Sequence, residues 1–109
     1  MKYPIYLFRK YLEGLVDLLS EERSSNYDTW IKTGFCIHNL NRAKYGYNLW
    51  IKFSKKLSKF DLNSCNKQWQ VMNNKNTGGV GMGSMIHWAA KDSPKDFHKH
   101  RCDALESSI

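Results

Sequence analysis

Residues 45–57 read YGYNLWIKFSKKL and form the clearest helical pattern in the chain. Drawn as a helix, the segment divides into an apolar arc and a basic arc. The apolar arc consists of Gly46, Leu49, Trp50, Phe53 and Leu57. The basic strip, as the lysines on the other side are called below, consists of Lys52, Lys55, Lys56 and Lys59, with no acid among them. Because neighbouring like charges repel one another, a phosphate-bearing partner explains this strip better than helix stability does, and a solvated lysine face is the alternative.

Four tryptophans mark the same kind of segment along the chain. Trp30, Trp50, Trp69 and Trp88 lie nineteen or twenty residues apart, which is about one helix plus one connection. The pattern predicts an all-α fold, a small irregular or orthogonal bundle of five to six short helices. The first three tryptophans lie on apolar stripes and are expected in the core. Trp88 projects to one side of its stripe and is the one tryptophan considered for stacking on a base.

Capping signals and glycines set the expected helix boundaries. The expected helices cover residues 4–19, 25–38, 45–57, 61–72, 82–91 and 93–106. A short polar connection is predicted at 20–24, loops at 39–42 and 73–79, and at most a short strand at 79–82. Asp61 is predicted to cap its helix, and Gly34 to let a neighbouring helix approach closely. The last helix is mostly polar and is expected either to fray or to depend on a neighbour.

Composition and charge restrict the class of protein. The 109 residues are expected to form a single domain, 1–109, and the odd number of cysteines argues against a disulfide framework, so we expect a reducing intracellular compartment. The apolar stretch 5–19 is interrupted by charges, which excludes a membrane-spanning helix and a membrane partner. Residues 29–91 carry ten basic residues and one acid, whereas the flanks are slightly acidic. Such an asymmetry indicates a middle segment that faces a polyanion.

Catalytic and metal-binding patterns are largely missing from the sequence. Magnesium chemistry needs clustered carboxylates, and the basic middle segment offers only Asp61. The spacing of the cysteines and histidines does not suit zinc, so Cys36 and Cys65 are expected as buried apolar packers. The glycine-rich segment 78–84 resembles a phosphate cradle but lacks the P-loop lysine, and a flexible connection is its alternative. We therefore expect no cofactor, no metal site and no catalytic residue in this chain.

An ordered set of motifs resembles one known family. The motifs are Tyr27-x-x-Trp30-x-x-x-Gly34, Leu49-Trp50-x-x-Phe53-Ser54, Ser58-Lys59-Phe60, Cys65-x-x-x-Trp69 and Ala89-Ala90-Lys91. Together they resemble the second type of primase C-terminal domain, the PriCT family, over residues 12–91. Residues 92–109 would then form a C-terminal helix or tail towards a following domain. Phe53 stands where the family often has tryptophan, and Gly81 where a threonine commonly opens the last helix.

The resemblance implies an all-helical accessory module within the replicative primase–helicase of a large DNA virus, phage or plasmid. The catalytic residues would lie in the adjacent primase and helicase domains of the same polypeptide, and the site of action would be where a virus replicates in its host, such as the cytoplasm. The proposed partner is DNA, as a single strand or a primer–template. The residues expected to contact its phosphates are Lys52, Lys55, Lys56 and Lys59, supported by Arg42, Lys44, Lys67 and Lys75.

Two alternatives belong to other classes of protein. One is a protein-interaction spacer that orients primase and helicase or supports assembly without binding DNA. The other is a stand-alone DNA-binding regulator, which would need polar base-reading residues that the basic strip lacks.

Overall fold

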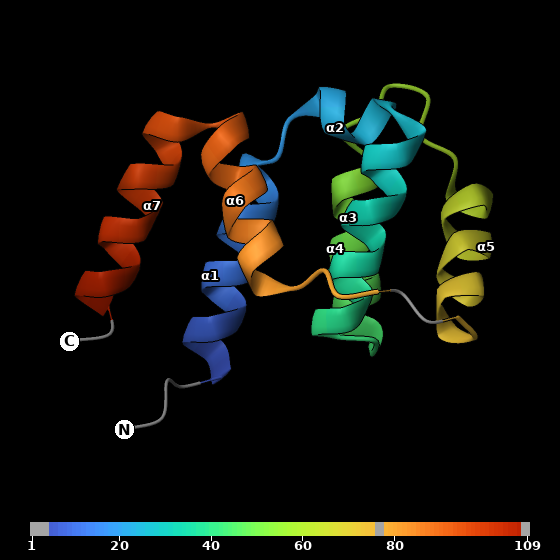
Figure 1. Ribbon diagram of the computed structural model, residues 1–109, viewed down its shortest axis with the longest axis horizontal. Helices are drawn as coiled ribbons and strands as arrows, with labels where there is room; N and C mark the ends of the chain where they lie inside the picture. The colour runs from blue at the N-terminus through green and yellow to red at the C-terminus, as the bar shows by residue number, and fades with distance from the viewer. Residues whose placement is uncertain (1–4, 76–77, 108–109) are drawn as a thin grey trace.

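The computed structural model describes residues 5–75 and 78–107, and these residues form seven helices and no strand (Figure 1). The helices are α1 (Ile5–Leu18), α2 (Glu21–Ser25), α3 (Tyr27–Leu40), α4 (Lys44–Ser54), α5 (Leu62–Asn73), α6 (Met82–Asp92) and α7 (Pro94–Ser107). The predicted all-α class is confirmed, with one helix more than expected. The predicted first helical position, Pro4, and residues 76–77 of the predicted glycine loop lie outside the described residues.

The helices form two groups along the long axis of the molecule (Figure 1). Helix α1 packs against α4, α6 and α7, while α3 packs against α4, α5 and α6. Helices α7 and α5 lie at opposite ends of the ribbon, which measures 41 × 28 × 21 Å. The contacts of α7 with α1 and α6 agree with the expectation that this mostly polar helix depends on its neighbours.

The core combines apolar stripes from five helices. Its buried residues are Leu12, Leu15, Val16, Leu19, Cys36, Ile37, Leu49, Trp50, Phe53, Cys65, Trp69, Met72, Met85 and Ala89. The predictions for Trp50, Trp69 and both core cysteines are confirmed. Trp30 is different, because it packs against Trp50 with 4.7 Å between ring centroids but stays only partly buried. The partial exposure of Trp30 opens a cleft that is described below.

Side-chain caps explain several helix boundaries. Helix α2 occupies the predicted connection because the Ser20 hydroxyl accepts a hydrogen bond from the Arg23 amide at 3.1 Å. The helix expected from residue 25 begins later, at Tyr27, since Asn26 caps α3 by accepting from the Asp28 amide at 3.0 Å. Asp61 caps α5 as predicted, accepting from the Asn63 amide at 3.1 Å. Helix α4 ends at Ser54, earlier than residue 57, so the basic strip extends beyond the helix.

Two glycines permit close helix packing. A Cβ at Gly34 would lie 2.5 Å from the Met72 methyl group and 2.7 Å from the Trp50 ring, which confirms the predicted close approach. A Cβ at Gly46 would lie 1.7 Å from the Asn41 carbonyl oxygen, so only glycine fits where α4 begins. The strand considered at 79–82 does not form. Instead the side-chain amide of Asn39, a residue of α3, donates to the Val80 carbonyl at 2.8 Å.

Candidate nucleic-acid interface

Lys56 of the basic strip forms hydrogen bonds with the backbone at the end of helix α1. Its ammonium group donates to the carbonyl oxygens of Asp17 and Leu19, both at 2.7 Å. The first of these carbonyls lies in the last turn of α1 and the second directly after it, where backbone acceptors have no partner inside the helix. Burial lowers the pKa of Lys56, opposed by the negative charge of Asp17. Lys56 therefore has a structural role that its place on the sequence pattern does not reveal.

Lys52 faces an acid that the sequence pattern does not place beside it. Its ammonium lies 2.9 Å from the Asp17 carboxylate, and both side chains are 52% exposed. The basic strip has no acid among its own residues, but the fold brings Asp17 of α1 beside it. An exposed ion pair of this kind contributes little, so Lys52 can still exchange Asp17 for another anion.

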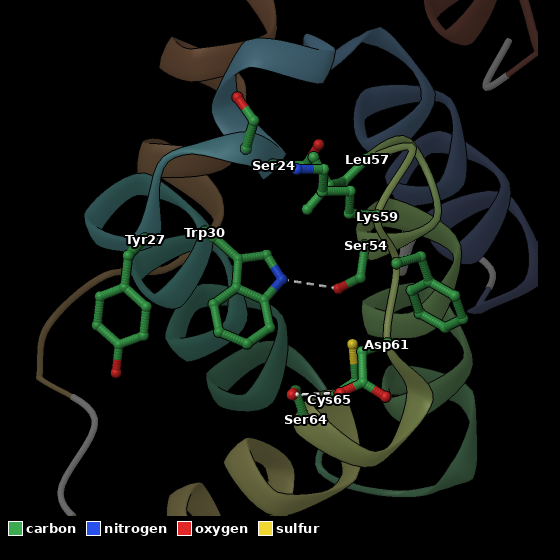
Figure 2. A pocket seen from close by; sticks show the side chains of 11 residues that line it. Ser24, Tyr27, Trp30, Ser54, Leu57, Lys59, Asp61, Ser64 and Cys65 are labelled. Carbon is green, nitrogen blue, oxygen red and sulfur yellow. Dashed lines mark hydrogen bonds between the residues drawn. The ribbon is translucent and has the colours of Figure 1, made fainter.

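Lys59 lines a cleft beside Trp30, called the Trp30 cleft below (Figure 2). The cleft has a volume of about 230 Å³, and its walls include Trp30, Ser54, Leu57, Lys59, Phe60 and Asp61. The Trp30 indole points across it and donates to the Ser54 hydroxyl at 2.9 Å (Figure 2). The Lys55 ammonium lies 5.9 Å from the centre of the Phe60 ring. Two members of the basic strip thus lie near an apolar hollow.

Arg42 and Lys44 meet at a second, wider hollow, the α4–α5 groove. The groove has a volume of about 490 Å³ and is lined by Arg42, Ala43, Lys44, Tyr47, Asn66, Trp69, Gln70 and Asn73. Both cations are exposed, no carboxylate is among the lining residues, and neither cation forms a salt bridge within residues 5–75 and 78–107. The groove therefore combines positive charge, amide groups and aromatic surface, which are the groups that bind nucleic-acid backbones.

The wall of the α4–α5 groove is held by side-chain hydrogen bonds. The Tyr47 hydroxyl donates to Asn66 Oδ1, and His38 Nε2 lies 2.8 Å from Asn73 Oδ1. Trp69 supports both sides, because Tyr47 and His38 each contact its ring edge-to-face, with centroids at 6.0 and 4.9 Å. The side chains of Asn66 and Asn73 make these contacts through oxygen, and within residues 5–75 and 78–107 their –NH₂ groups remain as donors for a ligand. Sequence analysis missed the amides of this groove, although their spacing on α5 is helical.

The remaining predicted residues are not among those that line these two hollows. Lys67 is exposed on α5, and the Lys75 ammonium lies 5.6 Å from the centre of the Phe35 ring. Trp88 is partly buried, with the Arg23 guanidinium carbon 5.3 Å from its ring centre. One contact of Trp88 is therefore already made within the protein, and its role in stacking stays a prediction.

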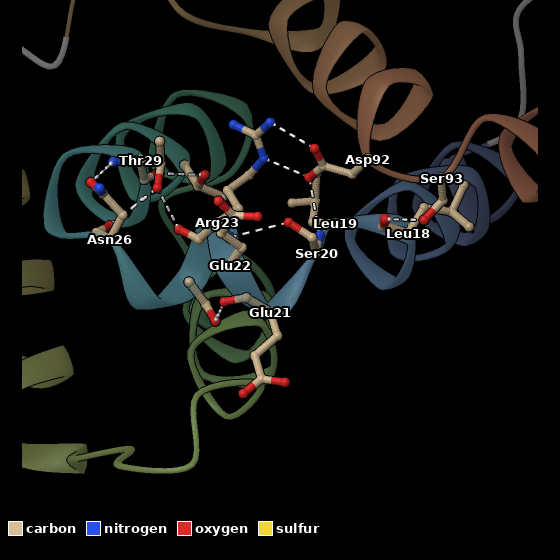
Figure 3. Close-up of polar contacts among 12 residues, drawn as sticks. Leu18, Leu19, Ser20, Glu21, Glu22, Arg23, Asn26, Thr29, Asp92 and Ser93 are labelled. Atoms are coloured by element: carbon tan, nitrogen blue, oxygen red, sulfur yellow. Dashed lines mark hydrogen bonds and ion pairs between the residues drawn. The ribbon is translucent and has the colours of Figure 1, made fainter.

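Arg23 and Asp92 form an ion pair that joins α2 to α6 (Figure 3). Arg23 Nε and Nη2 donate to the Asp92 carboxylate at 2.7 and 2.9 Å, and the Ser20 amide donates to it at 3.0 Å. Burial by itself raises the pKa of Asp92, but the hydrogen bonds from Arg23 and Ser20 outweigh it and lower the pKa. Sequence analysis missed this pair, although an acid in the last turn of a helix, where the dipole disfavours it, is a signal.

The glycine-rich segment before α6 is a turn pinned by α3. Gly78 adopts a φ of 80°, the left-handed conformation that favours glycine, and Asn39 donates to its carbonyl at 3.2 Å. Gly81 stands at the N-cap of α6 without a side-chain cap, as its departure from threonine implies. The phosphate cradle considered for this segment stays a prediction.

Cys36 is a buried thiol beside the start of α6. Burial raises the pKa of the Cys36 thiol to about 12, opposed by a backbone contact, and its Sγ lies 3.1 Å from the Gly81 carbonyl oxygen. Across residues 5–75 and 78–107, no three His, Cys, Asp or Glu side chains gather where they could hold a metal ion. Within the same residues, none of the helices has the length and apolar character to cross a membrane.

The sequence is similar to known proteins over most of its length. The family model described as Primase C terminal 2 (PriCT-2) matches residues 12–89. "Putative helicase L207/L206" of Acanthamoeba polyphaga mimivirus is 35% identical over 86 residues, which cover 78% of this chain and 9% of that protein. "Putative helicase 022R" of Frog virus 3 (isolate Goorha) is 29% identical over 87 residues, with 78% and 9% covered. The chain thus spans about a tenth of the length of these relatives, and no solved structure matches it.

Proposed function

We propose that this chain, which belongs to the primase C-terminal 2 (PriCT-2) family, acts as a helical accessory module of a replicative DNA primase–helicase. Its task in this proposal is to hold the template or primer–template backbone beside the primase catalytic domain, without catalysing a reaction itself. The family match over residues 12–89 confirms the resemblance predicted over residues 12–91. The viral relatives, whose names contain the word helicase, support a replicative setting.

The α4–α5 groove is the observation that carries this proposal. Arg42 and Lys44 present two exposed cations at a hollow lined with amides and free of carboxylates. Phosphate oxygens accept hydrogen bonds from both kinds of donor, so the groove favours a backbone and carries no sequence information. Within the basic strip, Lys55 and Lys59 remain suited to the same task, whereas Lys56 is held by α1.

A salt-dependent titration with labelled single-stranded DNA tests the groove. Each phosphate that is neutralised steepens the dependence of log K on log salt by about 0.7 for a single strand. We expect the double variant Arg42→Glu/Lys44→Glu to weaken binding by at least about tenfold and to reduce the slope by about 1.4. The matched control Lys95→Glu/Lys99→Glu makes the same charge change on α7, at the opposite end of the molecule (Figure 1). Equal slopes for both variants would contradict the proposal.

A protein-interaction spacer is the second candidate, and two exposed apolar residues favour it. Ile5 and Tyr6, at the start of α1, are 70% and 69% exposed. Such residues suit a contact with an adjacent domain of a longer polypeptide. This candidate predicts that the isolated chain does not bind DNA at any salt concentration. It also predicts that Ile5→Ser/Tyr6→Ser in the full-length protein lowers its oligomeric state in analytical ultracentrifugation.

A further inference from the structure

The Trp30 cleft has walls suited to a flat ring. Three of the serine hydroxyls that line it are already bound, because Ser24 donates to the Glu21 carbonyl at 2.7 Å, Ser25 to the Glu22 carbonyl at 2.9 Å and Ser64 to the Asp61 carboxylate at 2.8 Å. Trp30 itself donates to Ser54 (Figure 2). With these polar groups satisfied inside the protein, the surface left for a ligand is mainly the indole of Trp30 and the side chains of Leu57 and Phe60.

The volume of the cleft limits what can enter it. At about 230 Å³ it is smaller than the pockets of about 300–1,000 Å³ that hold drug-sized ligands. One ring system fits such a space, whereas a whole nucleotide does not. The rest of any larger ligand must therefore lie outside, along the surface beside the cleft.

The charges near the mouth favour an anionic chain outside the cleft. Lys59 lines the cleft and is exposed, and the Lys55 ammonium lies against the Phe60 ring at 5.9 Å. The one acid of the lining, Asp61, accepts hydrogen bonds from Ser64 and the Asn63 amide, which hold its pKa below the usual range. Its charge is thus partly balanced by the start of α5, while no described acid forms a salt bridge with either lysine.

We propose that the Trp30 cleft binds one unstacked nucleobase of a single strand, with Lys55 and Lys59 contacting the phosphates on either side. This inference rests on the proposed function and adds to it a second, base-dependent contact apart from the α4–α5 groove. Binding by ring stacking tolerates any base, because every base has a π-face. Trp30 is prepared for this role, since Trp50 supports one side of its ring and Ser54 fixes the indole N–H.

A comparison of two oligonucleotides of equal length and charge tests the inference on the whole chain. One is oligothymidylate, and the other is the same backbone with abasic sites throughout. Loss of one stacked base weakens binding by about tenfold, so we expect the intact strand to bind that much more tightly. In a ¹H–¹⁵N NMR spectrum, the indole N–H resonance of Trp30 is expected to move with the intact strand and not with the abasic strand, whereas that of buried Trp50 stays.

A substitution that fills the cleft can be compared with a matched control. Ser64→Phe places a large side chain in the cleft, and Asn63→Phe places the same side chain on the neighbouring exposed residue that does not line it. We expect the difference between the two strands to vanish in Ser64→Phe and to persist in Asn63→Phe, with both variants showing cooperative thermal unfolding.

Three results would overturn the inference. Equal, salt-dependent binding of both strands would remove the base contact and leave the proposed function standing. Absence of binding by either strand at low salt would remove both. A shift of the Trp30 resonance with N-acetylphenylalaninamide but not with the intact strand would assign the cleft to an aromatic side chain of a protein partner.

Discussion

The ion pair between Arg23 and Asp92 offers a sharp test of how the two helix groups are joined. Both side chains are nearly buried, with 11% and 9% of their surface exposed, and Arg23 binds the carboxylate through two nitrogens. Asp92→Ala removes this acceptor and leaves three donors without a partner, two on Arg23 and the amide of Ser20 (Figure 3). The substitution therefore tests a contact between residues that are far apart along the chain.

The expected loss of stability follows from the burial of Arg23. Removing one partner of a buried, hydrogen-bonded ion pair costs about 3–5 kcal/mol, because a charge is left unpaired. Since Arg23 keeps 11% of its side-chain surface in contact with solvent, we expect about 3 kcal/mol. For a domain of this size, that loss lowers Tm by about 12–20 °C.

Urea and thermal unfolding followed by circular dichroism measure this loss. The control is Asp96→Ala, since Asp96 is exposed in the first turn of α7, and we expect a change below about 0.5 kcal/mol. A loss below about 1 kcal/mol for Asp92→Ala, or equal losses for the two variants, would refute the reasoning.

The pH dependence supplies a second readout for the same contact. The pKa of Asp92 is lower in the folded protein than in the unfolded chain, so folding favours the ionised form. Its stabilising contribution is complete above the unfolded pKa of about 3.9 and is lost as the pH falls through the lower folded pKa. We expect the difference in stability between the wild-type protein and Asp92→Ala to begin to shrink below about pH 4 and to vanish once the pH is below the folded pKa of Asp92.

Substitutions at Gly46, near the start of α4, and at Lys56, just after its end, test packing at two further places. Gly46→Ala would place its Cβ 1.7 Å from the Asn41 carbonyl oxygen, and we expect a loss of about 3 kcal/mol or more in the free energy of unfolding, measured with urea. The control is Gly83→Ala, whose Cβ would lie in open space. We expect it to cost nothing or to stabilise the protein by about 0.5–1 kcal/mol. Lys56→Met removes the donor to the carbonyls at the end of α1, and we expect a loss of about 1–2 kcal/mol in the same assay. We expect the DNA affinity of this variant to stay within about twofold of wild type. A large loss of affinity with unchanged stability would contradict the structural role of Lys56.

Most of the fold could be predicted because its signals are local. The spacing of apolar residues identified six of the seven described helices, and Asp61 marked the start of α5. Helix α2 escaped prediction because five residues carry no periodic pattern, and only the Ser20 cap marks its start. Trp30 was expected in the core because its stripe is apolar, but its partial exposure depends on where the turn after α4 lies.

The candidate site could be predicted less well, because its residues come from separate helices. Arg42 and Lys44 were expected to contact phosphates, yet nothing in their spacing indicated that Asn66 and Asn73 of α5 would line the same groove. For the basic strip, residues that lie close together in sequence turned out to have different surroundings. In the fold, Lys56 donates to backbone carbonyls at the end of α1 and Lys52 pairs with Asp17 of α1.

The amino-acid sequence was enough to establish an all-helical domain, its buried aromatic centre and its family, because helical periodicity and motif order are carried by neighbouring residues. The packing of helices had to be known before Asp17 could be placed beside Lys52, Asp92 beside Arg23, or His100 over Gly14, where its ring stacks on Tyr11 at 4.9 Å. Residues that lie many positions apart meet only when their helices pack. The charges left unpaired by that packing, and hence those available to a ligand, are therefore a property of the folded chain.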